Sequence, residues 1–178
     1  VVEQSLLRPV LCQKEEDFVI VDDRITTYLH SLEMPDIPVI EEIEKEALEA
    51  YVPIIRKETQ SFLKVLLTIQ KPKRILEVGT AVGFSAVLMS HYMPKDGHII
   101  TIENYEKRIP VARANFARAE KEDKITLLEG DALEVMKTLE GPYDFIFMDA
   151  AKGQYIHYMP EVLRLLAPEG VLMSDNVL

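Results

Sequence analysis

Apolar residues recur three and four positions apart along the first part of the chain, which is the spacing of amphipathic helices. Three such segments precede Pro72, at residues 20–32, 40–51 and 62–69, and prolines separate them. The pattern predicts a helical front over residues 20–71 that lacks strands. Residues 1–17 mix charged and apolar side chains without a period, which predicts a loose N-terminal arm.

After Pro72, short apolar runs alternate with helical patterns. The runs predict strands at 74–78, 98–102, 124–128, 143–148 and 171–174, and the segments between them predict helices at 84–92, 106–119, 132–139 and 156–166. Nearly continuous apolar strands that alternate with helices are typical of a parallel sheet covered on both faces. We therefore predict a doubly wound, mostly parallel α/β core over residues 72–178. In such a core, ligands bind outside the carboxyl ends of the strands.

Composition narrows the class of protein. The 178 residues suffice for one domain with a sizeable core, and no apolar run approaches the roughly 20 residues of a membrane span. The single cysteine, Cys12, predicts a reduced, cytoplasmic protein. A net charge of −10 argues against broad affinity for nucleic acids, although a local basic patch is compatible with it. The sequence begins without Met and stops after a predicted strand, which suggests a fragment.

The most informative segment lies at the end of the first predicted strand. There, Gly79 and Gly83 bracket a turn that opens into a helix. Glycine lets the backbone approach a ligand closely, and a helix start offers free N–H donors. A dinucleotide-binding turn has a further glycine between these two. Its absence favours an adenosine that carries an amino acid, as in S-adenosylmethionine (SAM), although a purely structural turn fits the same residues.

Acidic residues follow the next two strands. Glu103 comes about 20 residues after the glycines, where a carboxylate can accept both hydroxyls of a ribose. The third strand ends in Gly130, Asp131 and Ala132, which places a carboxylate where the adenine amino group could lie. For both acids the alternative is helix N-capping, because acids favour helix starts. Their occurrence together with the glycine turn favours ligand binding.

The last two predicted strands end in Asp149 and in Asp175-Asn176. We expect these strands to be neighbours in the sheet, so that their carboxyl ends lie side by side. Two carboxylates and an amide oxygen suit Mg²⁺, whereas the lack of His and Cys makes zinc a poor candidate. Loop capping by the same three residues is the alternative. In this architecture we favour the metal.

Together these residues resemble a known family. The segments that carry the resemblance are Glu77-Val-Gly-Thr-Ala-Val-Gly-Phe-Ser85, Glu103, Gly130-Asp-Ala132, Met148-Asp-Ala-Ala-Lys-Gly-Gln-Tyr155 and Asp175-Asn-Val-Leu178. They resemble, over about residues 24–178, the metal-dependent, catechol-type O-methyltransferases that use SAM. Ala150–Tyr155 and the acidic helical front are most similar to bacterial tRNA 5-hydroxyuridine methyltransferases, which make 5-methoxyuridine at the anticodon wobble position.

The resemblance implies a Rossmann-like methyltransferase domain over residues 18–178. Members of the family add a further helix and an antiparallel pair of strands that are missing from this sequence. The implied cofactor residues are Glu103 for the ribose, Asp131 and Ala132 for the adenine, Gly79 and Ser85 for the methionine end, and Ile55 and Asp149 as further contacts. The implied Mg²⁺ ligands are Asp149, Asp175 and Asn176.

The chemistry of the implied substrates explains the metal. A catechol and 5-hydroxyuracil both carry two oxygens on adjacent ring carbons, and such a pair chelates Mg²⁺, which favours the ionised hydroxyl. Lys152 lies about one helical turn after Asp149. It would take the proton if the metal and burial lower its pKa.

Three functions stay open. The first is methylation of 5-hydroxyuridine in tRNA, which the segment Lys152–Tyr155 favours. The second is methylation of a small catechol or phenol, which the negative net charge favours. The third is a SAM-binding module without turnover. The resemblance further implies a homodimer, and nothing in the sequence predicts membrane attachment.

Overall fold

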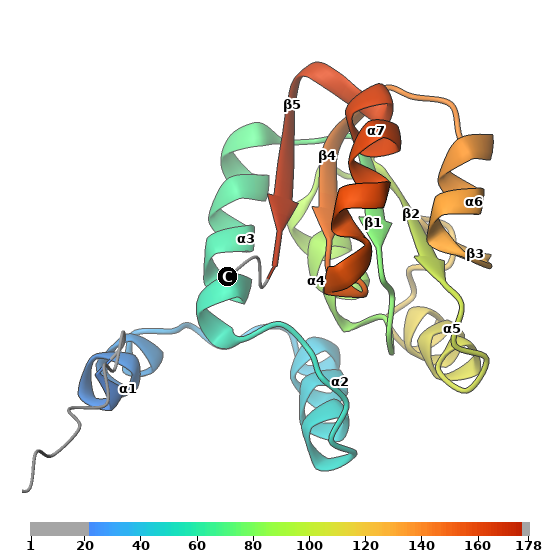
Figure 1. The fold of residues 1–178 in the computed structure, drawn as a ribbon. Coiled ribbons are helices and arrows are strands. Elements are labelled where there is room, and N and C mark those ends of the chain that lie inside the picture. Colours follow the sequence, from blue (N-terminus) through green and yellow to red (C-terminus); the bar gives the residue numbers. More distant parts are fainter. Residues whose placement is uncertain (1–21, 176–178) are drawn as a thin grey trace, which may run out of the picture. The chain divides into compact units, whose positions relative to one another are not determined.

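The computed structural model describes residues 22–175 (Figure 1). The predicted arm over residues 1–17, Cys12 and Asn176 lie outside the described residues. The chain divides between Leu32 and Glu33 into two units. The first unit contains α1 (Asp23–Ser31), which begins after Asp22, whose carboxylate accepts a hydrogen bond from a backbone N–H of the first turn. All other described helices and strands belong to the second unit.

Five parallel strands in the order β3-β2-β1-β4-β5 form the sheet of the second unit. The strands are β1 (Arg74–Val78), β2 (His98–Glu103), β3 (Ile125–Glu129), β4 (Tyr143–Met148) and β5 (Leu166–Ser174). The helices are α2 (Pro38–Glu49), α3 (Lys57–Gln70), α4 (Phe84–Tyr92), α5 (Ile109–Arg118), α6 (Ala132–Thr138) and α7 (Tyr155–Leu165), and a short 3₁₀ helix, η1 (Lys152–Gln154), precedes α7. The predicted α/β class with a parallel sheet is confirmed.

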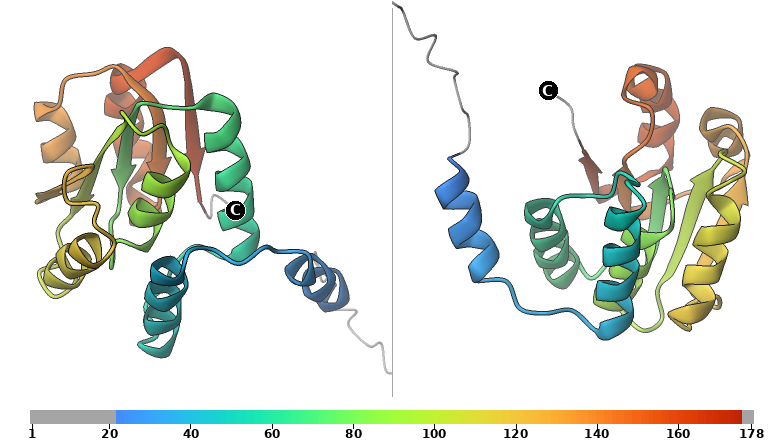
Figure 2. Two further views of the ribbon diagram at one scale, coloured as in Figure 1. Left: turned by 180° about the vertical axis from the view of Figure 1, so that it is seen from behind. Right: turned by 90° about the horizontal axis from the view of Figure 1, so that it is seen from below.

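Helices lie on both faces of the sheet (Figure 2). Successive side chains of a strand pack alternately into these two helical layers. In β1, Ile75 packs into the cluster formed with α2 to α5, whereas Leu76 packs into the cluster formed with α6 and α7. Their register partners in β4, Phe145 and Ile146, divide in the same way. Both faces of the sheet are therefore buried, which explains why the strands are apolar at nearly every position.

Two boundaries differ clearly from their predictions. One is the start of α3, which lies at Lys57, five residues before the predicted segment at 62–69. The other is the start of β5. β5 begins at Leu166, five residues before the predicted start at residue 171. The prediction placed the start too late because Pro168-Glu-Gly170 is typical of a turn. In the structure Leu166 pairs with Tyr143, and a register shift absorbs the extra residues before Phe145 pairs with Val171. An irregular strand pairing of this kind leaves no simple pattern in the sequence.

The strand order places a ligand site. From β1 the chain crosses to β2 and β3 on one side, and β4 and β5 lie on the other side (Figure 1). A parallel sheet leaves a crevice at the carboxyl ends of the strands where the order reverses, which here is between β1 and β4. Within residues 22–175, no helix is long and apolar enough to cross a membrane.

Candidate active site

A cavity of about 380 Å³ lies at the carboxyl ends of the strands. Ligand sites for small molecules commonly have volumes of about 300–1,000 Å³. Of the predicted cofactor residues, Ile55, Gly79, Ser85, Glu103, Ala132 and Asp149 line this cavity. Lys152 and Asp175 line it as well. The cavity thus brings together nearly all of the predicted site within the described part of the chain.

The structure gives a reason for the two glycines of the turn that matches the structural alternative left open by the sequence. A Cβ on Gly79 would lie 2.3 Å from the backbone oxygen of Asp149, and a Cβ on Gly83 would lie 2.5 Å from the ring of Phe116. Both glycines also have positive φ angles, of 103° and 81°. Contact with the protein itself therefore requires glycine at these positions, and the close approach of a cofactor to this turn stays a prediction.

Glu103 is held in place by the backbone around it. One carboxylate oxygen accepts a hydrogen bond from the Ala81 N–H at 2.7 Å, and the other accepts from the N–H groups of Asn104 and Tyr105 at 3.0 and 2.9 Å. Hydrogen bonds from N–H groups to both oxygens fix the orientation of this carboxylate. A fixed carboxylate at the cavity wall suits the recognition of vicinal hydroxyls.

Asp131 caps α6, as the alternative interpretation proposed. Its Oδ1 accepts hydrogen bonds from the N–H groups of Leu133 and Glu134 at 3.0 and 3.2 Å. The residues on either side, Gly130 and Ala132, line the cavity, but Asp131 is not among the lining residues. Helix capping therefore accounts for an acid at position 131, and contact of Asp131 with adenine stays a prediction.

The carboxyl group of Glu77 is a buried acid for which the sequence predicted no role. It lies in β1 with no exposed surface, and its two carboxyl oxygens are hydrogen-bonded to the hydroxyls of Ser85 and Thr101, each at 2.5 Å. Burial, together with the smaller effect of the charges of Asp149 and Glu103, raises the pKa of Glu77 to about 8 against the opposing effect of these two hydroxyls. An acid inside an otherwise apolar strand was the signal that could have indicated this group.

The predicted metal-binding region contains an ion pair. The Lys152 Nζ lies 2.5 Å from Oδ1 of Asp149. Desolvation lowers the pKa of Lys152, but the hydrogen bond and charge of Asp149 outweigh it, so the pKa lies above its ordinary value. The lowered pKa that proton transfer to Lys152 requires depends on a bound cation, and it stays a prediction.

Tyr155 ties the ends of β4 and β5 together. Its hydroxyl lies within hydrogen-bond distance of two carbonyl oxygens, that of Met148 at 3.0 Å and that of Asp175 at 3.2 Å. The Asp175 N–H also donates to the Met148 carbonyl at 3.0 Å. These contacts place the backbones after the two strands side by side, as predicted. Among the described residues no cluster of three His, Cys, Asp or Glu side chains forms a metal site, and Asn176 lies outside them.

Comparison with known proteins identifies the family. Residues 29–178 match the protein family described as O-methyltransferase. This chain belongs to the O-methyltransferase family. The expectation of a methyltransferase is thereby confirmed at the level of the family.

Relatives within the O-methyltransferase family are named for related activities. The chain is 36% identical over 121 residues to a catechol O-methyltransferase of Niastella koreensis. This alignment covers 66% of this chain and 55% of the relative. It is 31% identical over 157 residues to a catechol O-methyltransferase of Mycobacterium tuberculosis, covering 86% and 71% of the two chains. The chain thus spans about half of the length of the first relative.

Solved structures of O-methyltransferases share the fold. The structure of an O-methyltransferase from Bacillus cereus in complex with SAH (S-adenosylhomocysteine) has a TM-score of 0.78 at 30% identity, over 86% of this chain and 72% of that one. O-methyltransferase TomG from Streptomyces achromogenes, solved in complex with SAM, has a TM-score of 0.77 at 26% identity, over 86% and 71%. The predicted Rossmann-like methyltransferase fold is confirmed, and these two neighbours bind the predicted type of cofactor.

Other residues of the cavity carried no signal in the sequence. Pro53 and Ile54 line the cavity beside Ile55, in the loop before α3. Arg108, directly before α5, and Tyr158, within α7, line it as well. None of these belongs to a motif with a defined spacing. They reach the cavity because the fold brings separate segments to one edge of the sheet.

Proposed function

We propose that this chain is a SAM-dependent O-methyltransferase whose acceptor carries two oxygens on adjacent ring carbons. The observation that supports this most is the content of one cavity at the switch point of the sheet. It contains the backbone-held carboxylate of Glu103 at the end of β2, and Asp149, Lys152 and Asp175 after β4 and β5. Glu103 suits the nucleoside of the cofactor, and the other three residues suit the acceptor.

The cofactor half would use residues that are already fixed in place. Glu103 would accept the ribose hydroxyls, Gly130 and Ala132 would border the adenine, and Ser85 would lie at the methionine end, where Glu77 supports its hydroxyl. Ile55 would close the cavity from the helical front. Prearranged groups of this kind reduce the entropy that binding and transfer cost.

The acceptor half would use Mg²⁺. Its donor set fits: Asp149 and Asp175 both line the cavity, and the Lys152 ammonium lies against Asp149, where a positive charge is accommodated. Asn176 would be the third ligand. When bound, SAM supplies an electrophilic methyl group on a sulfonium, and Mg²⁺ lowers the pKa of the acceptor hydroxyl.

Lys152 would then handle the acceptor proton. Lys152 now pairs with the Asp149 carboxylate, which raises the pKa of Lys152. If Asp149 instead held Mg²⁺, that contact would be lost and the charge of the ion would lower the pKa of Lys152, so that the ammonium would release its proton to solvent. The neutral amine formed in this way would accept the proton of the acceptor hydroxyl. Tyr155 would keep the segment in place through its contacts with the two strand ends.

For the acceptor itself, we propose 5-hydroxyuridine at the wobble position of tRNA. The similarity of Ala150–Tyr155 to tRNA 5-hydroxyuridine methyltransferases supports this choice, and the first three residues of this segment line the cavity. The adjacent O4 and O5 of the base would form the required pair of oxygens. A homodimer could add basic surface for the anticodon loop, and light scattering in solution would test for it.

A small catechol is the second candidate. The relatives from Niastella and Mycobacterium are both named catechol O-methyltransferases, and the net charge of −10 disfavours a polyanionic substrate. A catechol presents the same pair of adjacent oxygens to the same residues. The two candidates therefore differ in the acceptor and share the chemistry.

One assay distinguishes them. The protein is mixed with labelled SAM and either tRNA rich in 5-hydroxyuridine or a catechol, each with Mg²⁺ or with a chelator, and products are measured by mass spectrometry. Mg²⁺-dependent 5-methoxyuridine supports the tRNA proposal. Product from the catechol alone supports the second candidate. Failure of the chain to bind SAH or to methylate either acceptor would contradict the proposed activity.

A further inference from the structure

The wall of the cavity on the side of the helical front is a loop without regular structure. Residues 50–56 connect α2 to α3, and Pro53, Ile54 and Ile55 line the cavity. At its start the loop is held by a hydrogen bond from the Val52 N–H to the Ala47 carbonyl. Such a loop needs a further contact to hold the cavity-lining residues in one position.

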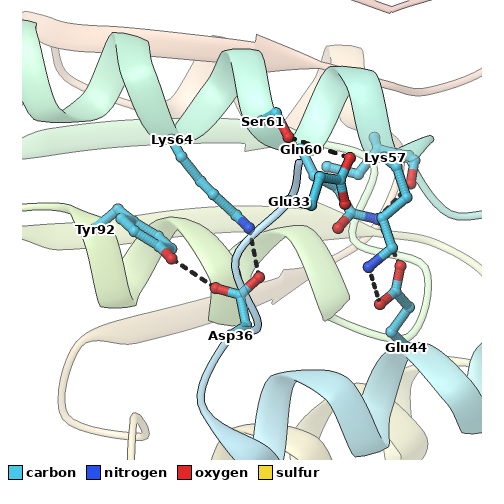
Figure 3. Close-up of polar contacts among 9 residues, drawn as sticks. Glu33, Asp36, Glu44, Lys57, Gln60, Ser61, Lys64 and Tyr92 are labelled. Carbon is cyan, nitrogen blue, oxygen red and sulfur yellow. Dashed lines mark hydrogen bonds and ion pairs between the residues drawn. The ribbon is translucent and has the colours of Figure 1, made fainter. Parts of the chain in front are cut away.

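A buried polar bridge provides that contact (Figure 3). The Gln60 side chain is 1% exposed, and its Nε2 donates to the Ile55 carbonyl at 3.0 Å and to Oε1 of Glu44 at 2.8 Å. The other Glu44 oxygen accepts from Lys57 at 2.5 Å. The bridge therefore joins α2, α3 and the cavity wall through one amide group.

The bridge has features that stability alone does not explain. Oε1 of Gln60 is buried and has no hydrogen-bond partner among residues 22–175, which is unfavourable for folding. Buried polar groups can often be replaced by apolar residues with little loss of stability, and in some proteins they instead specify a position. With both amide hydrogens directed at acceptors, Gln60 specifies where the Ile55 carbonyl lies.

We propose that Gln60 is a positioning residue for cofactor binding. It holds Pro53–Ile55, which form one wall of the cavity, in a fixed position. This inference rests on the proposed function, because it assumes that the cavity binds SAM. Glu44 and Lys57 act in turn on Gln60, since they orient its amide. Loss of the bridge lets the wall move and so weakens the binding of SAM and SAH.

The same helix offers a matched control. Lys64, one turn after Gln60, pairs with Asp36 at 2.5 Å, and Asp36 also accepts from the Tyr92 hydroxyl at 2.6 Å (Figure 3). This second network fastens the segment before α2, and none of its three residues lines the cavity. Gln60→Met and Lys64→Met therefore each break one polar tether of α3 with the same replacement residue.

The test measures SAH affinity by calorimetry and hydrogen exchange of the amides of residues 54–56. Gln60→Met should raise the Kd for SAH about fivefold or more, as expected for the loss of one hydrogen bond, and should speed exchange in the loop. Lys64→Met should leave both unchanged, even if it lowers the thermal midpoint. Lys57→Met, at a partly exposed position, should show a smaller effect in the direction of Gln60→Met and provides a second test if Gln60→Met does not fold.

The outcomes separate the two proposals. If the native chain binds SAH and Gln60→Met matches Lys64→Met in both affinity and exchange, Gln60 has no positioning role. A positioning role is equally excluded if Gln60→Met does not fold and Lys57→Met binds SAH as the native chain does. If the native chain does not bind SAH at all, the proposed function fails and the inference fails with it.

Discussion

Replacing Glu77 with Gln tests whether the buried carboxyl in β1 is protonated. Burial raises the pKa of Glu77 to about 8 in the folded chain, whereas the ordinary value is 4.5. Gln has nearly the same shape and imitates the protonated form. Its carbonyl oxygen can accept from one of the two hydroxyls that now contact Glu77, and its amide can donate to the other.

The sign and size of the effect follow from proton linkage. Below pH 4.5 the carboxyl is protonated in both the folded and the unfolded chain, so the full stability is present. Between pH 4.5 and about 8 the unfolded chain loses this proton and the folded chain keeps it, so stability falls as pH rises. The loss is about 1.4 kcal/mol for each pH unit, or about 3 kcal/mol from pH 5.5 to 7.5. Glu77→Gln lacks this loss.

Urea unfolding of both proteins at pH 5.5, 6.5 and 7.5 measures the effect. The stability of Glu77→Gln relative to the native chain should increase by about 3 kcal/mol over this range. Glu122→Gln, at an exposed turn, controls for the removal of one acidic group. A constant difference between Glu77→Gln and the native chain would show that Glu77 is ionised in the folded protein, and the reasoning from burial would be refuted.

Three further outcomes are expected. Gly83→Ala should lower the free energy of unfolding by about 2–4 kcal/mol in urea titrations, because the new Cβ would clash with the Phe116 ring and Ala disfavours the positive φ of this position. A loss below about 0.5 kcal/mol would contradict this. Glu103→Gln should raise the Kd for SAH about 10- to 100-fold by calorimetry, as expected for a charged hydrogen-bond acceptor, and unchanged affinity would remove Glu103 from the ribose site. Asp149→Ala should lower methyl transfer at least about 100-fold, and full activity of this variant in the presence of a chelator would overturn the Mg²⁺ proposal.

The sequence was sufficient for the order and type of the elements. The strands at 74–78 and 143–148 and the helix at 84–92 were predicted with the bounds that the structure shows. Apolar runs, helical spacing and turn residues are local signals, and a parallel arrangement brings the ends of all strands to one edge. Glu103, Asp149 and Asp175 could therefore be placed around one cavity from the sequence alone.

The tertiary structure decided what each residue meets there. Gly79 has to be glycine because its backbone approaches that of Asp149, 70 positions later in the chain. The pKa of Glu77 is raised because helices and neighbouring strands exclude water from it, and Gln60 reaches the Ile55 carbonyl because α3 folds back over the loop. Spacing in a sequence encodes elements that repeat every few residues. Burial and hydrogen bonding at this site depend on residues from separate elements, and no local pattern records which of them come together.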